Sequence, residues 1–277
     1  MVSVKIENYD DSNGYSADTF TFPYNPRVFD DVLTSNKELI NIRFSKYHIY
    51  NTRGGINPKS LVLSGTLSSS SKHTNYGLLA KHIMEAKLKK VFFKSDRFYI
   101  SLGDQIKQTN SGGRTNFLDY VSTINCPVGL AFSNTQKDDT YDGSNWSGGS
   151  VVNSGTTSTF IEKIVVTLDT SGSAADTVII ADNHDNGITV TLDAYSEDDT
   201  LTIYFITLIE NIRIKSTKYW YCYQSSSGGA SIIREITSTK NSLDLQLEPA
   251  ENVNTLSFSG TANVKTYKVY FRDAYYS

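Results

Sequence analysis

Hydrophobic and polar residues alternate along much of the chain, in short runs that turn-forming residues separate. In the first 135 residues the clearest runs are INIRFSKYHIY at 40–50, SLVLSGTL at 60–67 and KVFFKSDRFYISL at 90–102. A period of two is typical of strands with one buried face. The third run is interrupted at its centre by polar residues, which predicts a hairpin. Gly65 predicts a β-bulge in the second run.

One segment follows the helical period instead. HTNYGLLAKHIMEAKLKK at 73–90 predicts an amphipathic helix with Thr74 or Asn75 as its N-cap. Its predicted buried face comprises Tyr76, Leu79, Ala80 and Ile83. Five lysines lie on this helix and its exit: Lys81, Lys87, Lys89, Lys90 and Lys94. Because no Gly-rich phosphate loop accompanies them, we interpret them as a solvent-exposed face or as a surface complementary to an acidic neighbouring subunit.

In the second half of the chain, short apolar runs follow one another at regular spacing, from FIEKIVVTL at 160–168 to TYKVYFR at 266–272. Between two of them, Asn186 and Gly187 form a strong signal for a two-residue hairpin turn. Eight or more strands at this spacing are typical of an antiparallel sandwich or jelly roll. We therefore expect TYKVYFR to be a closing strand of such a sandwich.

The two patterns are separated by a stretch rich in Gly, Ser, Asn and Asp that has no apolar period. The charge changes sign at the same place. Residues 1–135 carry 16 Lys and Arg against 11 Asp and Glu, a net +5, whereas residues 136–277 carry 10 against 18, a net −8. We expect two modules in different environments: a domain at 1–135, a linker or loop at 136–155 and a domain at 156–277.

Composition supports a mainly β fold. The chain has 277 residues, including 18 Tyr and 13 Phe, and is long enough for one large β domain or two smaller ones. No apolar run is long enough to span a bilayer, so we expect no membrane partner. Cys126 and Cys222 are far apart, which favours two isolated thiols over the alternative of a disulfide.

The sequence gives little support for catalysis or for metal binding. None of the four histidines has the spacing of a zinc protease or follows a nucleophile elbow. The run ADNHDNG at 181–187 invites a calcium interpretation with Asp182, Asp185 and Asp193, but His184 stands where an oxygen ligand is needed. A solvated hairpin turn is the better interpretation. We expect no enzymatic activity, no metal and no cofactor.

An aromatic run at 218–224, KYWYCYQ, is the best candidate for a binding surface. Alternation predicts its tyrosines on one face of a strand and Trp220 with Cys222 on the other. Aromatic side chains on a β-sandwich can stack on sugar rings or on bases, although burial at a protein interface is an open alternative. The candidate carbohydrate contacts are Trp146, Trp220, Tyr219, Tyr221 and Tyr223.

Several segments together resemble the distal tail (Dit) proteins of long-tailed bacteriophages and related archaeal tailed viruses. FPYNP at 22–26 is similar to an early strand of that family, and NPKSLVLSGTLSSSS at 57–71 to the strand and Gly turn before its helix. The helix and the following hairpin, with Asp96 and Arg97, continue the resemblance. The run at 243–277 resembles the family's closing strands, with Ala250 where the family has Gly.

The resemblance implies a fold and a function. The first module would be a split β-barrel with one α-helix, and the second a galectin-like or carbohydrate-module-like sandwich. The protein would be a structural virion protein at the distal end of the tail, where its ring, usually a hexamer, joins the tail tube to the tip or baseplate and leaves a lumen for genome passage.

The implied partners are other copies of the chain, the tail tube protein, a tail-tip hub or tail-associated protein, and DNA in transit. A receptor-binding protein or a host-surface glycan is a further implied partner. Two alternatives remain open from the sequence. One is a carbohydrate-binding adhesion protein of the tail tip that uses the aromatic residues named above. The other, ranked below it, is a glycan-degrading enzyme, which would require a pair of carboxylates across a cleft.

Overall fold

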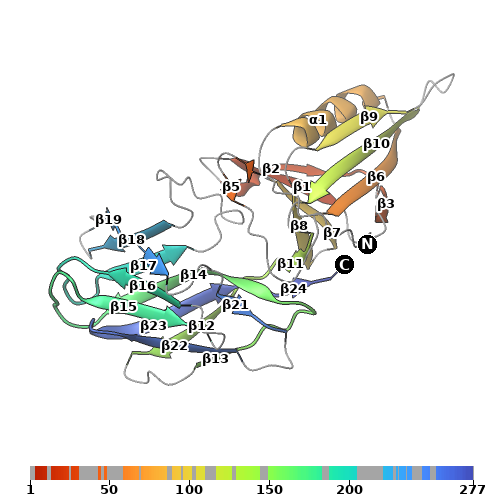
Figure 1. The fold of residues 1–277 in the computed structure, drawn as a ribbon. Coiled ribbons are helices and arrows are strands. Elements are labelled where there is room, and N and C mark those ends of the chain that lie inside the picture. The colour runs from red at the N-terminus through yellow and green to blue at the C-terminus, as the bar shows by residue number, and fades with distance from the viewer. Residues whose placement is uncertain are drawn as a thin grey trace. The chain divides into compact units, whose positions relative to one another are not determined.

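The structure is a computed structural model of the chain. It describes residues 4–10, 14–24, 26–30, 43–44, 47–48, 59–68, 70–85, 89–94, 96–101, 104–109, 117–126, 129–143, 149–182, 187–204, 221–226, 229, 231–234, 236–238, 245–249 and 254–276. The chain divides into two compact units, residues 1–134 and 135–276, here called unit 1 and unit 2 (Figure 1). Antiparallel strands dominate both units, so the prediction of a mainly β fold is confirmed.

Unit 1 contains two antiparallel sheets and a helix. The first sheet has the order β2-β1-β7-β8-β11 and consists of β1 (Lys5–Asp10), β2 (Gly14–Thr21), β7 (Lys89–Lys94), β8 (Arg97–Ser101) and β11 (Ala131–Ser133). The second has the order β3-β6-β10-β9 and consists of β3 (Arg27–Asp30), β6 (Lys59–Ser68), β9 (Gln105–Gln108) and β10 (Phe117–Cys126). Helix α1 (Lys72–Met84) packs along β9 and β10 and also contacts β6 and β2 (Figure 1).

Two of the predicted strand runs in unit 1 have different outcomes. The run at 90–102 forms the predicted hairpin, in which β7 pairs with β8. The run at 40–50 is not one strand: its described residues form β4 (Arg43–Phe44) and β5 (Tyr47–His48), which pair with each other. A period of two does not show where a chain reverses, because both arms of a hairpin have that period.

Gly65 does not form the predicted bulge. Strands β6 and β10 pair in one unbroken register, and Gly65 lies opposite Tyr120. A Cβ atom on Gly65 would meet the Tyr120 hydroxyl oxygen at 2.6 Å. The glycine therefore makes room for the buried Tyr120 ring, which stacks with Phe22 at a centroid distance of 6.2 Å.

The helix is shorter than predicted and begins earlier. It starts at Lys72, so Thr74 and Asn75 lie inside it, and Ser71 at the N-cap position makes no side-chain capping hydrogen bond. Its last residue is Met84, whereas the final two residues of the predicted helix belong to β7. A period cannot place a helix end when the flanking residues also favour helix, as these lysines do.

The buried face of α1 includes Leu79 and Ile83, as predicted, together with His82. The Nδ1 atom of His82 lies 2.9 Å from the Leu78 carbonyl oxygen, and its Nε2 atom lies 2.8 Å from an Asp18 carboxylate oxygen. Because Asp18 belongs to β2, this contact connects the helix to the first sheet.

Lys89 corrects the prediction of a solvent-exposed lysine face. Its side chain is fully buried, donates a 2.8 Å hydrogen bond to the Glu85 carbonyl oxygen and lies 3.5 Å from the equally buried carboxylate of Asp104. Asp104 also accepts hydrogen bonds from the Ser101 hydroxyl and, at 2.8 Å, from the Asn125 N–H. Burial lowers the pKa of Lys89 and raises the pKa of Asp104, since both charged forms lose hydration.

Unit 2 is a sandwich of two antiparallel sheets. One has the order β12-β23-β14-β17-β18-β19, with β21 pairing to β14, and the other has the order β13-β22-β15-β16-β20. The strands of these two sheets are β12 (Lys137–Asp142), β13 (Gly149–Val151), β14 (Thr159–Leu168), β15 (Thr177–Ala181), β16 (Gly187–Thr191), β17 (Thr200–Tyr204), β18 (Tyr221–Ser225), β19 (Ser231–Ile233), β20 (Ile236–Ser238), β21 (Gln246–Leu247), β22 (Asn254–Gly260) and β23 (Val264–Phe271). Strand β24 (Ala274–Tyr275) lies outside both sheets.

The segment predicted as a linker, 136–155, belongs to the sandwich. Strand β12 pairs with β23 along its whole length, and β13 pairs with β22. The prediction was wrong because five of the six residues of β12 are polar, and Tyr141 is the one side chain of this strand that packs against the apolar core. Pairing with β23, which lies far away in the sequence, makes this polar segment a strand. Unit 1 ends at Asn134, next to the predicted end of the first module at 135.

The prediction that TYKVYFR is a core strand is confirmed. It falls in β23, which is hydrogen-bonded to β12 on one side and to β14 on the other, and its Tyr267, Val269 and Phe271 side chains are buried. The hairpin predicted around Asn186 and Gly187 pairs β15 with β16, but Gly187 opposes Ala181 as a strand residue. The connection between them is therefore longer than the predicted two-residue turn.

Candidate functional site

The predicted carbohydrate contacts have different outcomes. Trp146, Tyr219 and Trp220 lie outside the described residues. Tyr221 is described as the first residue of β18, but its side chain is not among those described. Tyr223, two residues further along β18, is described with its side chain and is partly exposed.

Tyr223 lies on the outer face of its sheet, as the predicted alternation requires. Its neighbour Cys222 points to the opposite face and is buried in the apolar core of the sandwich. The Tyr223 ring stacks with that of Tyr204 on β17, with centroids 6.1 Å apart and ring planes at 26°. The two tyrosines are diagonal neighbours, since Tyr204 pairs with Tyr221 and Thr202 pairs with Tyr223.

The strand register extends this surface across β14 and β23. Lys163 pairs with Tyr204 on one side and with Tyr270 on the other. Its ammonium group lies 4.5 Å from the centroid of the Tyr270 ring and 5.9 Å from that of Tyr204, within the range of cation–π attraction. Tyr270, Lys163, Tyr204 and Tyr223 thus form a continuous surface, here called the tyrosine–lysine ladder.

A second lysine lies at one end of this ladder. Lys268, two residues before Tyr270 on β23, places its ammonium group 5.2 Å from the centroid of the Tyr270 ring and 2.8 Å from an Asp138 carboxylate oxygen on β12. The hydrogen bond that Lys268 donates to Asp138 raises the pKa of Lys268, so this lysine is cationic at neutral pH.

Sequence reasoning missed the other three members of the ladder. Lys163, Tyr204 and Tyr270 come from three strands that are far apart in the chain, and each stands at an outward position of an alternating run. Alternation alone identifies them as outward-facing. The register that aligns the three strands depends on tertiary pairing, which a single sequence does not display.

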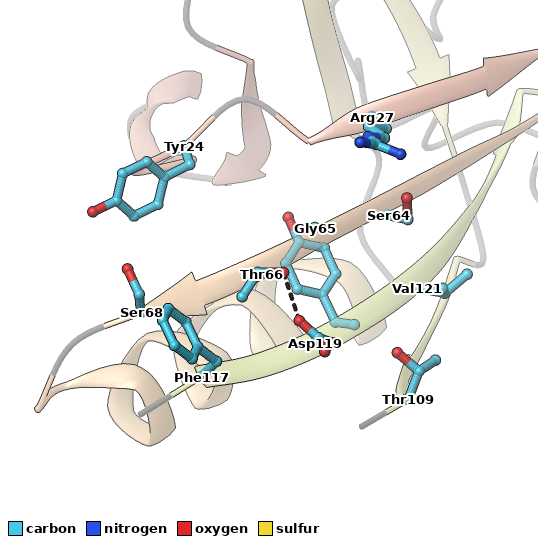
Figure 2. A pocket seen from close by; sticks show the side chains of 11 residues that line it. Tyr24, Arg27, Ser64, Gly65, Thr66, Ser68, Thr109, Phe117, Asp119 and Val121 are labelled. Carbon is cyan, nitrogen blue, oxygen red and sulfur yellow. Dashed lines mark hydrogen bonds between the residues drawn. The ribbon is translucent and has the colours of Figure 1, made fainter. Parts of the chain in front are cut away.

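Unit 1 has a separate hollow on the outer face of its second sheet. It is an open groove with a volume of about 520 Å³, lined by Tyr24, Arg27, Ser64, Gly65, Thr66, Ser68, Thr109, Phe117, Asp119, Tyr120 and Val121. Figure 2 shows Ser64, Thr66 and Ser68 along one strand, and Phe117, Asp119 and Val121 along the next. The Thr66 hydroxyl donates a 2.5 Å hydrogen bond to Asp119.

Two aromatic residues flank this groove. Tyr24 is 61% exposed and Phe117 is 43% exposed, although both are large side chains. Four of the other lining residues bear small hydroxyl groups: Ser64, Thr66, Ser68 and Thr109. Exposed aromatic side chains beside an open groove are typical of protein contact sites.

The residues considered for metal binding and thiol chemistry can be placed in part. Among the described residues, no group of three or more His, Cys, Asp or Glu side chains is arranged to hold a metal ion. Asp185 and His184 lie outside the described residues, and Asp193 lies 3.4 Å from Arg234. Cys126 and Cys222 are both free and buried, which confirms the prediction of two isolated thiols.

Burial raises the pKa of the Cys222 thiol to about 12, so this sulfur is a poor nucleophile at neutral pH. Among the described helical residues, no segment is both long and apolar enough to cross a bilayer.

Comparisons with known proteins give distant likenesses. No protein-family model matches the chain, and no curated protein sequence matches it. Its fold is similar to the Dit protein of phage SPP1, described as a paradigm of the hub adsorption apparatus of phages that infect Gram-positive bacteria, with 12% identity, a TM-score of 0.44 and coverage of 91% of this chain and 90% of that chain. It is also similar to a chain of the phage P2 baseplate in its activated conformation with Ca, with 8% identity, a TM-score of 0.38 and coverage of 99% and 98%. With TM-scores below 0.5, these likenesses are too distant to assign a function to this chain.

Proposed function

We propose that this chain is a structural protein of a tailed virus, a distal tail protein without enzymatic activity. The observation that carries the proposal is the order of elements in unit 1. Strand β6, helix α1 and the hairpin β7–β8 follow one another where the segments at 57–71, 73–90 and 90–102 resemble that family. In unit 2 the run at 243–277 contains β22 and β23, one strand in each sheet of the sandwich, where the same resemblance implies closing strands.

In this proposal unit 1 builds a ring. The groove and the exposed Tyr24 and Phe117 beside it offer a contact for a neighbouring copy, and edge strands of the same sheet have backbone groups that a neighbour can cover. A ring requires a heterologous contact, in which this surface meets a different surface of the next copy. Six copies would close the ring around a lumen for the passing genome, between the tail tube protein and the tip hub.

The net charges support different partners for the two units. Residues 1–135 carry a net +5 and residues 136–277 a net −8. The positive unit is suited to stacking on an acidic tube or tip protein, and this attraction weakens in high salt. The acidic sandwich would project from the ring at the distal end of the tail.

Native mass spectrometry and electron microscopy of the full chain at high protein concentration test this proposal. We expect closed rings, which the variant Phe117→Asp should disrupt because a charge would be buried in the contact. The control is Ile232→Asp, which adds the same charge at an exposed position of unit 2. Rings that survive Phe117→Asp, or that Ile232→Asp disrupts instead, would refute the proposed contact surface.

A further inference from the structure

The tyrosine–lysine ladder has the geometry of a binding surface. Its tyrosines are only partly buried, although the opposite face of the same strands packs tightly into the core. The ladder crosses from β23 to β18, three strand spacings, which is about 14 Å at the usual separation of strands. This length suits an elongated ligand that lies across the strands.

The ladder combines aromatic rings with a fixed cation. Lys163 is held between the rings of Tyr270 and Tyr204, at 4.5 Å and 5.9 Å from their centroids. A side chain fixed in this way loses less conformational freedom when it binds an anion than a lysine that extends into water. The rings beside it can stack against the apolar face of a sugar, with the hydroxyls of the tyrosines as hydrogen-bonding groups.

We propose that the tyrosine–lysine ladder binds a saccharide that carries an acidic group, either a carboxylate or a phosphate. The sugar rings stack on Tyr204 and Tyr223, and the acidic group pairs with Lys163. Of the carbohydrate contacts expected from the sequence, Tyr223 belongs to this site. Lys163, Tyr204 and Tyr270 are new members.

The charge around the ladder selects against nucleic acid. Single strands also stack their bases on aromatic side chains, but they carry one phosphate per nucleotide and require an extended basic groove. Residues 136–277 carry a net −8, and Asp138 lies 2.8 Å from the second lysine of this surface. A small cationic surface on an acidic unit favours a ligand with isolated negative charges over a polyanion.

Titration calorimetry of the full chain with defined oligosaccharides tests the proposal. The probes are an aldotetraouronic acid, a tetrasaccharide that carries one carboxylate, glucose 1-phosphate, which carries a phosphate, and maltotetraose, which is neutral. We expect one or both acidic probes to bind at least about tenfold more tightly than maltotetraose, a difference that shrinks in high salt. A single-stranded oligothymidine serves as the nucleic-acid probe and is expected to bind more weakly than either.

Variants of the ladder separate the contribution of the lysine charge to binding from that of the aromatic rings. Lys163→Gln should weaken binding of the acidic probe about tenfold and make it independent of salt, whereas Lys163→Arg should retain it. Tyr204→Ala should weaken binding of the same probe about tenfold, whereas Tyr204→Phe, which keeps the ring, should have a small effect. Unchanged melting temperatures would show that these variants remain folded.

Two matched controls lie on the same unit. Lys265→Gln removes the same charge from the neighbouring strand β23, five residues from Tyr270 or about 16 Å along that strand, where Lys265 is paired with Asp198. Tyr276→Ala removes an equally large ring that is 60% exposed. Both controls should bind the acidic probe as the unchanged chain does.

Four results would overturn the proposal. They are absence of binding to both acidic probes at millimolar concentration, equal binding of maltotetraose, tighter binding of the oligothymidine, and equal losses in the ladder variants and their controls. Because binding is measured on the chain whether or not it assembles, failure of ring formation and failure of sugar binding are separate outcomes.

Discussion

Unit 1 encloses a fully buried ammonium–carboxylate pair in its interior, whereas each ion pair described in unit 2 keeps at least one partner partly exposed. In unit 1, Lys89 and Asp104 are both fully buried. Unit 2 has a large cluster of buried aliphatic and aromatic residues, and its most deeply buried ion pair among the described residues joins Glu162 on β14 to Arg272, which directly follows β23. The same chain thus stabilises two β folds by different means, and the two units should fail under different substitutions.

For unit 2 we expect the largest loss of stability from a substitution in β23, a strand with a hydrogen-bonded neighbour on each side. Val269 pairs with Asp139 on β12 and with Ile164 on β14, and its side chain is fully buried. Val269→Pro removes a ladder hydrogen bond whichever neighbour the N–H contacts, so it should cost at least about 3 kcal/mol and unfold unit 2. Hydrogen exchange should then show lost protection in residues 135–276 and retained protection in β6 and β10.

Equal loss of protection in both units after Val269→Pro would show that the units are not independent in stability. The matched control is Glu197→Pro, which places proline in an exposed turn of the same unit, between β16 and β17. The control should have a smaller effect, because a turn residue lies outside the ladder of strand hydrogen bonds.

For unit 1 we expect the corresponding loss of stability from a substitution in the buried pair of Lys89 and Asp104. Asp104→Asn keeps the shape of the side chain but leaves the charge of Lys89 without its carboxylate in the interior, which should cost about 3–5 kcal/mol in chemical denaturation. Adding Lys89→Met removes the orphaned charge and should restore most of that loss. A double variant as unstable as the single one would show that the hydrogen bonds of the pair, not its charge balance, stabilise unit 1.

The pH dependence of unit 1 follows from the same pair. Burial raises the pKa of Asp104 above its ordinary 3.8, so its contribution to stability falls as the pH rises through that range. Burial lowers the pKa of Lys89 below its ordinary 10.5, so its contribution falls as the pH drops below that value. At pH 7 both effects oppose folding, and the double variant should unfold with a flatter pH profile than the unchanged chain.

A smaller effect is expected from the glycines of unit 1. Gly65→Ala would place a methyl group 2.6 Å from the Tyr120 hydroxyl oxygen, and displacing that buried ring should cost about 1–3 kcal/mol. Gly77→Ala is the matched control on the exposed face of α1, where nothing lies within 4 Å, and it should stabilise the unit by about 0.5–1 kcal/mol. Thermal unfolding of the two variants measures the expected loss of stability in Gly65→Ala and the expected gain in Gly77→Ala.

Local sequence patterns predicted which segments form strands better than they predicted which strands pair with one another. Alternation located β6 and β23 because each has one face in a core, and it placed Tyr223 on the outer face opposite Cys222. It failed for β12, whose polar residues become a strand through pairing with β23. The structural outcome there depended on a partner more than 120 residues away.

The same limit applied to side chains. Lys89 stands in a run of lysines that suggests solvent, and its burial depends on Asp104, which the fold brings to it from beyond the next strand. Three of the four members of the tyrosine–lysine ladder were missed for the same reason. For the ladder residues alternation gave the outward direction, whereas the direction of Lys89 and the neighbours of all these side chains depended on tertiary pairing.

The labelling rates of the two free thiols can report on the opening of each unit separately. This is the smallest of the effects that we expect. Cys126 ends β10 in unit 1, Cys222 lies on β18 in unit 2, and both are 1% exposed. Because burial raises the pKa of Cys222 to about 12, its thiolate fraction at pH 8 is about one in ten thousand, and iodoacetamide should label the native chain very slowly. In Asp104→Asn, peptide mapping should find Cys126 labelled before Cys222, and Val269→Pro should reverse that order. Labelling of both thiols at one rate in either variant would mean that the two units open together, and the contrast between a charged and an apolar interior would then have no consequence for stability.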